Sequence, residues 1–405
     1  MKTDEKINKQ VLILLYEGMY VMQKYRVPLQ AMIVIILLIT VTTFTGCGQQ
    51  KEAGKGQQIT LTDVERRQVN LKVPVDKVIL QGSGSGGGFL TLLALEGKEA
   101  PKKIAGWDPG LKEFRYDMWE KFSKAVPGFK EIPDVGTMYK ETFSVEKVIS
   151  LKPDVVILPA HMYKQAKDVV KKLGDAGIPV VVIDYHAETL ENHTKSILLL
   201  GKILGKEKRS QEIVGFYKEQ VNKVCSRLEK INKPKPTVYV EIGIDGPSTY
   251  ANSYGNDMWG ALIEKCGGKN IGKGKIIGIS GPLNPEYVLK SNPDVIIITG
   301  SYWPKKADSM RLGYLSNLEE SKALLKNFTN RPGWENLNAI KNNRVYSIHH
   351  GLSRDIYDSA AIQYLAKVFY PEEFRDLDPL ETFKEFHRRF LPVDYSGVWM
   401  MSLKD

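Results

Sequence analysis

Cysteine is scarce in this sequence, which contains only three Cys among its 405 residues. The sequence leaves open whether Cys225 and Cys266 form a disulfide, because nothing in their surroundings argues for a pair. No Cys-x-x-Cys and no His-x-x-x-His spacing occurs. No spacing in the sequence therefore suggests a common structural zinc site.

Blocks of like charge are also missing, although the formal net charge of the chain is +10. The basic residues are scattered, and aromatic and basic residues do not alternate in the manner of a nucleic-acid-binding surface. We therefore expect no nucleic-acid partner. A dispersed positive charge is typical of a solvated surface, and it would also suit an anionic ligand or an anionic cell envelope.

The sequence has no apolar run long enough for an ordinary transmembrane helix, which needs about 20 residues. Its clearest apolar run, residues 31–41, follows Lys24 and Arg26 and ends shortly before Cys47. A basic flank, a short apolar core and small residues before a cleavage point are typical of an export signal. The segment resembles a bacterial lipoprotein signal with the lipid on Cys47, except that Phe44 stands where Leu is usual.

The segment after Cys47 is polar and rich in Gly, with too little apolar surface to fold. We interpret residues 1–46 as a cleaved signal peptide and residues 47–57 as a flexible tether. The long stretch before the apolar core leaves the translation start open between Met1, Met19 and Met22. This pattern predicts an extracytoplasmic bacterial protein that is anchored to the cell membrane by a lipid.

Short β-branched runs alternate with amphipathic stretches along the rest of the chain. Several runs are apolar throughout, which indicates parallel strands that are buried on both faces. The first two strands are close enough to form an antiparallel hairpin. The alternation as a whole predicts an α/β fold. The predicted strands are 59–61, 68–71, 77–80, 154–158, 180–183, 237–241, 294–299 and 344–348.

The middle of the chain is helical by its periodicity, over 188–204 and 207–231. Gly205 separates the two helices, and two prolines at 234 and 236 end the second one. A helix of about 25 residues is about 37 Å long. That length is enough to connect one domain to another.

A repeat flanks this helical segment, since residues 144–158 align with residues 284–298. Each copy predicts a short helix, a Pro-Asp turn and a buried strand, with Ser144 or Asn284 as the N-cap. The two copies predict two similar Rossmann-like α/β lobes joined by a long rigid helix, with a ligand cleft between them. The predicted parts are a first lobe at 58–187, a helical connector at 188–232 and a second lobe at 233–405.

Several weak motifs occur in a fixed order over residues 58–395. With them the chain resembles the substrate-binding lipoproteins of ABC importers for iron chelates, haem and cobalamin. The motifs that carry the resemblance are Thr62-Asp63 with Pro74 and Val78, the two Glu…Pro-Asp repeats, Gly177-Ile-Pro-Val180, Cys266-Gly-Gly-Lys-Asn-Ile271, Trp334 to Tyr346, and Tyr370-Pro-Glu-Glu-Phe374.

The resemblance implies a monomer without catalytic activity or an intrinsic cofactor. Such a protein captures a small solute, most typically an iron–siderophore complex, and delivers it to permease and ATPase subunits. Haem, a corrinoid and a molybdate-type oxyanion remain as alternative ligands. A surface-anchored hydrolase is the alternative of another class, and a surface binding protein without a transporter would need the same cleft.

The resemblance also assigns a docking role to Glu146 and Glu286, which would pair with arginines of the permease. Two carboxylates at equivalent points of two lobes suit a partner with two-fold symmetry. The alternative is that each Glu only complements the dipole of the helix in whose first turn it lies.

Residues that follow the carboxyl ends of parallel strands are expected to line the cleft. His and Tyr side chains can complete a metal shell, aromatic rings can flank a bulky chelate, and Arg can bind an anionic group. His349 belongs to a His349-His350 doublet after the last predicted strand. The predicted ligand residues are His161, Tyr163, Tyr250, Tyr302, Trp303, His349 and Arg354.

Two enzymatic motifs are present only in part. The Gly-rich segment 82–87 matches a dinucleotide fingerprint, but we identify no strand ending in an acidic residue about 20 residues later. The serines of this segment lack the Gly-x-Ser-x-Gly frame of hydrolases. The glycines are better suited to let backbone amides approach a ligand.

Overall fold

The computed structural model of this chain describes residues 56–85 and 87–404. Cys47, the predicted signal peptide and nearly all of the predicted tether lie outside the described residues. Within the described part, no helix combines the length and the apolar character that a membrane crossing requires.

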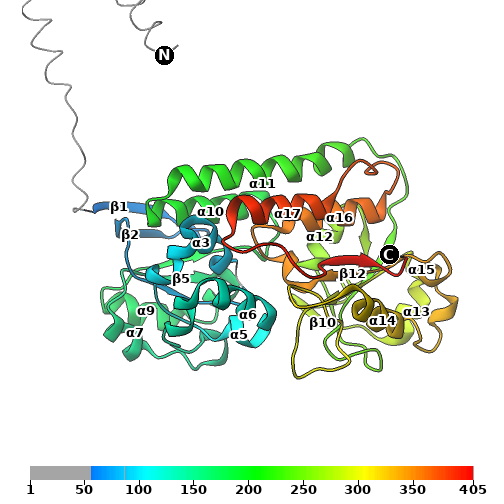
Figure 1. The fold of residues 1–405 in the computed structure, drawn as a ribbon, viewed down its shortest axis with the longest axis horizontal. Helices are drawn as coiled ribbons and strands as arrows, with labels where there is room; N and C mark the ends of the chain where they lie inside the picture. The colour runs from blue at the N-terminus through cyan, green and yellow to red at the C-terminus, as the bar shows by residue number, and fades with distance from the viewer. Residues whose placement is uncertain (1–55, 86, 405) are drawn as a thin grey trace, which may run out of the picture. The chain divides into compact units, whose positions relative to one another are not determined.

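Two largely parallel sheets organise residues 56–404 (Figure 1). We call the part around the first sheet the first lobe and the part around the second sheet the second lobe. The first sheet has the order β4-β3-β5-β6 and is parallel throughout, with β3 at Val78–Leu80, β4 at Ile104–Trp107, β5 at Val155–Pro159 and β6 at Val180–Ile183. The second has the order β13-β12-β11-β7-β9, with β7 at Thr237–Ile242, β9 at Lys269–Asn270, β11 at Val295–Gly300, β12 at Val345–His349 and an antiparallel β13 at Met400–Ser402.

Helices cover these sheets, and every residue of β5, β6 and β11 is buried. The predicted α/β fold with two lobes is confirmed. In the first lobe the helices are α3 (Gly88–Glu96), α4 (Ala100–Lys103), α5 (Gly110–Phe114), α6 (Tyr116–Ala125), α7 (Val145–Leu151), α8 (Ala160–Tyr163) and α9 (Lys167–Asp175). In the second lobe they are α12 (Trp259–Lys265), α13 (Pro285–Ser291), α14 (Leu318–Phe328), α15 (Asn338–Lys341), α16 (Asp358–Phe369) and α17 (Pro379–Phe390).

Two small antiparallel ribbons complete the described elements. The predicted hairpin at the start forms from β1 (Gln57–Thr62) and β2 (Gln68–Val73). The second ribbon pairs β8 (Asn252–Tyr254) with β10 (Ser280–Pro282).

The predicted repeat folds as a helix, a turn and a strand in both lobes. Ser144 caps α7 by accepting the N–H of Lys147, and Asn284 caps α13 in the same way. The aspartate that follows each Pro fixes the helix–strand unit to the neighbouring strand. Asp154 accepts the N–H groups of residues 76 and 77 at 2.8 Å, just before β3. Asp294 accepts the N–H of Thr237 at 2.9 Å, at the start of β7.

The helical segment between the sheets consists of α10 (Leu190–Leu204) and α11 (Glu207–Leu228), with Gly205 in the left-handed conformation between them. The 22 residues of α11 make a helix of about 33 Å. In Figure 1, α11 runs above both lobes, and α16 packs against it. Its buried face shares one hydrophobic core with α3 and α16. The connection between the lobes is therefore a packed helix rather than a flexible strand.

The structure corrects two sequence expectations. The strand β4 was not predicted, because Ala105 and Gly106, which are poor strand formers, interrupt a run of only four residues. A Cβ at Gly106 would lie 2.7 Å from the side chain of Val135, so the close packing of the neighbouring loop explains this glycine. The helix expected at 188 begins at Leu190, after the N-cap Thr189.

Arg115 and Asp117 make two of the polar contacts that connect the lobes directly. Arg115, between α5 and α6, forms a buried ion pair with Asp355 of the second lobe. On α6, the Oδ2 of Asp117 accepts the N–H of Tyr314 at 2.7 Å. A Cβ at Gly313 would collide with the Asp117 carboxylate, so this close approach requires glycine.

We expect Asp117→Asn to stabilise the protein at pH 7.5 but not at pH 4. Burial raises the pKa of the Asp117 carboxyl from 3.8 to about 6. Because the folded pKa exceeds the unfolded one, the ionised carboxylate destabilises the fold above pH 6, by about 3 kcal/mol at about 1.4 kcal/mol per pKa unit. This penalty disappears as the pH falls towards 4. Asn keeps an oxygen for the Tyr314 N–H and avoids the charge.

Urea denaturation of both proteins at the two pH values measures this difference. We expect the variant to be more stable by about 1–3 kcal/mol at pH 7.5 and equal at pH 4. A less stable variant at pH 7.5 would show that the ionised carboxylate itself holds the lobes together.

Candidate functional site

A cavity of about 620 Å³ lies between the two lobes. Small-molecule sites usually measure about 300–1,000 Å³, so this cavity has the size of a ligand site. The first lobe contributes Ser85, Asp108, Pro109, Gly110, Glu113, Phe114, Thr137, Tyr139, Lys140, His161 and Met162. The second lobe contributes Ile242, Ile244, Asp245, Tyr250, Ala251, Asn252, Trp303, His350 and Arg354.

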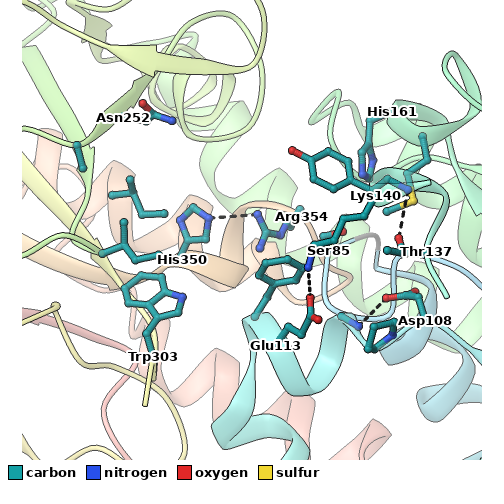
Figure 2. Close-up of a pocket in the computed structure, with 18 of the residues that line it drawn as sticks. Ser85, Asp108, Glu113, Thr137, Lys140, His161, Asn252, Trp303, His350 and Arg354 are labelled. Atoms are coloured by element: carbon teal, nitrogen blue, oxygen red, sulfur yellow. Dashed lines mark hydrogen bonds and ion pairs between the residues drawn. The ribbon is translucent and has the colours of Figure 1, made fainter. Parts of the chain in front are cut away.

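The cavity lies where the carboxyl ends of the strands of both sheets meet, as expected for α/β folds. His161 is in α8, directly after β5. Trp303 follows β11, and His350 is the first residue after β12. Figure 2 shows Arg354 between His350 and Trp303 on one side and His161 and Lys140 on the other.

The Gly-rich loop after β3 is held in place by Asp108. The two carboxylate oxygens of Asp108 accept the N–H of Ser83 at 2.8 Å and the N–H of Gly110 at 2.7 Å. A Cβ at Gly84 would lie 2.2 Å from the carbonyl oxygen of Gly110, so the two loops touch backbone to backbone. An acidic residue does follow a strand here, contrary to the sequence expectation. Both of its oxygens are nevertheless used to fasten the loop.

Arg354 brings a positive charge to the cavity without a matching negative one. Only 8% of the residue is exposed, and no described carboxylate lies within ion-pair distance of it. Its Nη1 is 3.2 Å from the Nε2 of His350, and its buried Nε has no partner among the described residues. The neighbouring Asp355 is already paired with Arg115.

The guanidinium of Arg354 is nevertheless charged at neutral pH. Burial, and then the nearby charge of Arg115, lower its pKa to about 10. A buried charge without a counter-ion is unfavourable, so the cavity is prepared for an anionic group.

Imidazole groups approach the cavity from both lobes. His350 places Nδ1 3.1 Å from the hydroxyl of Thr299. In the first lobe the rings of His161 and His186 lie 4.0 Å apart, and the Nδ1 atoms of both have no partner among the described residues. Burial lowers the pKa of His161 to about 4, and that of His186 well below its ordinary value. These neutral imidazoles can donate a hydrogen bond or bind a metal ion.

The wall at Tyr250 is supported by a buried ion pair. Arg331 binds both carboxylate oxygens of Glu241, at 2.6 and 2.9 Å. Its guanidinium lies 4.4 Å from the centre of the Tyr250 ring, and the Tyr250 hydroxyl accepts the Nε1–H of Trp334. The N–H of Ala251 also binds Glu241. This network holds the ring of Tyr250 as a fixed surface for a ligand.

Four of the seven predicted ligand residues line the cavity, namely His161, Tyr250, Trp303 and Arg354. Tyr163, Tyr302 and His349 do not. The ring of Tyr163 lies under the guanidinium of Arg67, at 4.6 Å, and the ring of Tyr302 stacks on Tyr116. His349 packs against Trp399, with the ring centres 4.4 Å apart. The doublet therefore offers His350 to the cavity and His349 to the core.

Sequence reasoning missed the cavity residues between β4 and α7. Lys140 and Glu113 form an ion pair of 2.6 Å at the edge of the cavity, and Thr137 lies nearby. These residues lie in a short helix and in loops without a motif. Recognising β4 in the sequence would have identified this wall, because β4 ends directly before Asp108 and residues after strand ends line the cavity.

Comparison with known proteins identifies relatives of the chain. The family model described as "Periplasmic binding protein" matches residues 93–351. An uncharacterised ABC transporter substrate-binding lipoprotein of Bacillus subtilis, YvrC, is 27% identical over 293 residues, covering 69% of this chain and 83% of its own. The molybdate-binding protein MolA of Haemophilus influenzae is 22% identical over 321 residues, covering 73% and 82%. Other relatives are named for iron uptake, iron(3+) citrate, iron(3+) hydroxamate and cobalamin.

A solved structure has a closer likeness. The TroA-like periplasmic binding protein FepB from Veillonella parvula is 51% identical to this chain. It aligns with a TM-score of 0.82 over 85% of this chain and 99% of its own.

Proposed function

This chain belongs to the periplasmic binding protein family, and from that premise we propose that it captures an anionic metal complex of the iron–siderophore type. It is the solute-binding component of an ABC importer. The complex would be bound outside the cell, between the two lobes, and delivered to the permease without chemical change. The single observation that carries the proposal is the buried, unpaired guanidinium of Arg354 in the wall of the cavity.

The charge and the shape of the cavity support an anionic chelate. Arg354 supplies a counter-charge, and His161 and His350 supply imidazole groups from opposite lobes. The rings of Tyr250 and Trp303 add apolar surface, which a bare oxyanion does not require. A molybdate-type oxyanion is the second candidate, because Arg354 offers it a cationic hydrogen-bond donor and one relative is named for molybdate. Haem or a corrinoid would use the same rings.

Delivery requires an anchor and a docking surface. We assign the lipid to Cys47, which lies outside the described residues, and docking to Glu146 and Glu286. Both glutamates are exposed, and neither has an ion-pair partner among the described residues. Each occupies the second position of its helix, in α7 and α13. Their carboxylates are thus available to arginines of a permease with two-fold symmetry.

Native mass spectrometry of residues 48–405 from the native host, with a metal scan of the same sample, tests the proposed ligand. We expect one bound complex per chain, with iron as its metal. If haem, a corrinoid or molybdate is found bound instead, that molecule is the ligand and the siderophore assignment is wrong. An empty protein whose melting temperature ignores siderophores, haem, cobalamin and molybdate would overturn the proposal.

A further inference from the structure

Three buried side chains from the connector and the second lobe meet in the interior of the protein. Glu188 precedes α10, His193 is in α10, and Asp358 is the first residue of α16. One possible ligand atom of each lies within 4.8 Å of the others. Glu188 is 4% exposed and the other two are 0% exposed. None of the three lines the cavity between the lobes, so the cluster is separate from the proposed solute site.

The carboxylates of this cluster have few donors, namely His193 and Tyr217 at Asp358 and a hydrogen bond that the two carboxyl groups share. All four oxygens of Glu188 and Asp358 are buried, and no backbone N–H of the described residues donates to them. The Oδ2 of Asp358 lies 3.1 Å from the Nδ1 of His193, as an ion-pair contact. The nearby Lys265 donates to the backbone carbonyl of Glu188 rather than to its carboxylate. Two such carboxylates side by side are unfavourable unless a cation or a proton lies between them.

The imidazole of His193 has the orientation of a metal ligand. Its Nε2 lies 3.0 Å from the backbone carbonyl oxygen of Tyr185, which can only accept, so Nε2 carries a proton. In the neutral ring, Nδ1 then presents its lone pair to the carboxylates. A carbonyl that fixes the distal N–H is the usual support of a metal-binding histidine. The hydroxyl of Tyr217, 2.8 Å from Nδ1, donates to this lone pair, so an ion at Nδ1 would displace that proton and have the Tyr217 oxygen beside it.

We propose that Glu188, His193 and Asp358 bind one divalent transition-metal ion, of the Zn²⁺ or Mn²⁺ class. One nitrogen and two or three oxygens are ligands that these ions accept. The ion would join the segment that enters α10, the helix α10 itself and the second lobe at a single point. It would be a structural ion and would not enter the transported solute.

Metal analysis after refolding tests the site, because a buried site fills most readily as the chain folds. The mature chain is unfolded in urea with EDTA, refolded with MnCl₂ or ZnCl₂, desalted and analysed for metal. We expect one ion per chain and a melting temperature that rises by several degrees. Glu188→Gln and Asp358→Asn should each weaken ion binding at least 100-fold. If one of these two variants fails to fold, the metal content of the other variant tests the site.

His161→Gln is the matched control, because it removes an imidazole of the cleft and leaves the buried cluster intact. This variant should retain the ion, whereas loss of the ion would place the metal in the cleft and overturn the proposal. A wild-type protein that refolds without stoichiometric metal would also overturn it, and would leave a proton shared by Glu188 and Asp358 as the stabilising element. The solute test above is independent, since an empty cleft does not affect this ion.

Discussion

Arg354→Met should abolish solute capture while leaving the ligand-free protein at least as stable as the wild type. Truncating one partner of a buried charge pair costs about 2–5 kcal/mol, so we expect affinity for the anionic complex to fall about 100-fold or more. The ligand-free protein should gain stability, because the substitution removes a buried guanidinium that has no counter-ion and Met fills much of the same space. Trp303 lies in the wall, so its fluorescence can report the titration. Thermal unfolding reports the stability.

Arg115→Met is the matched comparison, because Arg115 is also buried but has a carboxylate partner. Its loss would strand the carboxylate of Asp355, so this variant should lose stability by about 3–5 kcal/mol. The two substitutions are thus expected to change the stability of the protein in opposite directions. Unchanged affinity in Arg354→Met would refute the assignment of the anion site.

The position of Arg354 shows what the sequence could and could not predict. Its residue type and its place after the last long strand indicated an anion ligand. That it is unpaired could not be predicted, because the adjacent Asp355 is the natural partner in sequence. The structure gives Asp355 to Arg115, 240 residues away, and only this long-range pairing leaves Arg354 free.

The strands were predictable where burial on both faces produces a continuous apolar run. β6 has the predicted limits, and β5, β7, β11 and β12 differ from their predicted limits by one residue at one or both ends. β4 was not predicted because its apolar run contains Gly106. This glycine is explained by packing against Val135 and not by strand propensity. Packing between distant segments leaves no trace in a local pattern.

The cleft was predictable as a set of loops but not residue by residue. The rule for carboxyl ends of strands selected His161 and Trp303, and the cavity contains both. Consecutive side chains at a strand end point in different directions, so the choice between His349 and His350 depends on a backbone turn. The wall from α5 and residues 137–140 follows no motif, and it was missed.

Charge reversal at both docking positions, Glu146→Arg with Glu286→Arg, should reduce solute uptake by the importer at least 100-fold. Each reversal replaces an attraction to a permease guanidinium by a repulsion, and a lost buried partner alone costs about 2–5 kcal/mol. Affinity for the solute should not change, because both residues are exposed on helices outside the cavity wall. Uptake of labelled solute and affinity in solution separate the two effects.

Glu191→Arg provides the control for the helix-dipole alternative. Glu191 is exposed and occupies the same position in α10 that Glu146 occupies in α7, two residues after a capping hydroxyl. Its reversal removes the same favourable interaction with a helix N-terminus, about 0.3–1 kcal/mol. If Glu146 and Glu286 only complement their helices, all three reversals should lower stability slightly and spare uptake. If uptake is lost only in the variants reversed at Glu146 and Glu286, a partner that contacts both lobes at once is required.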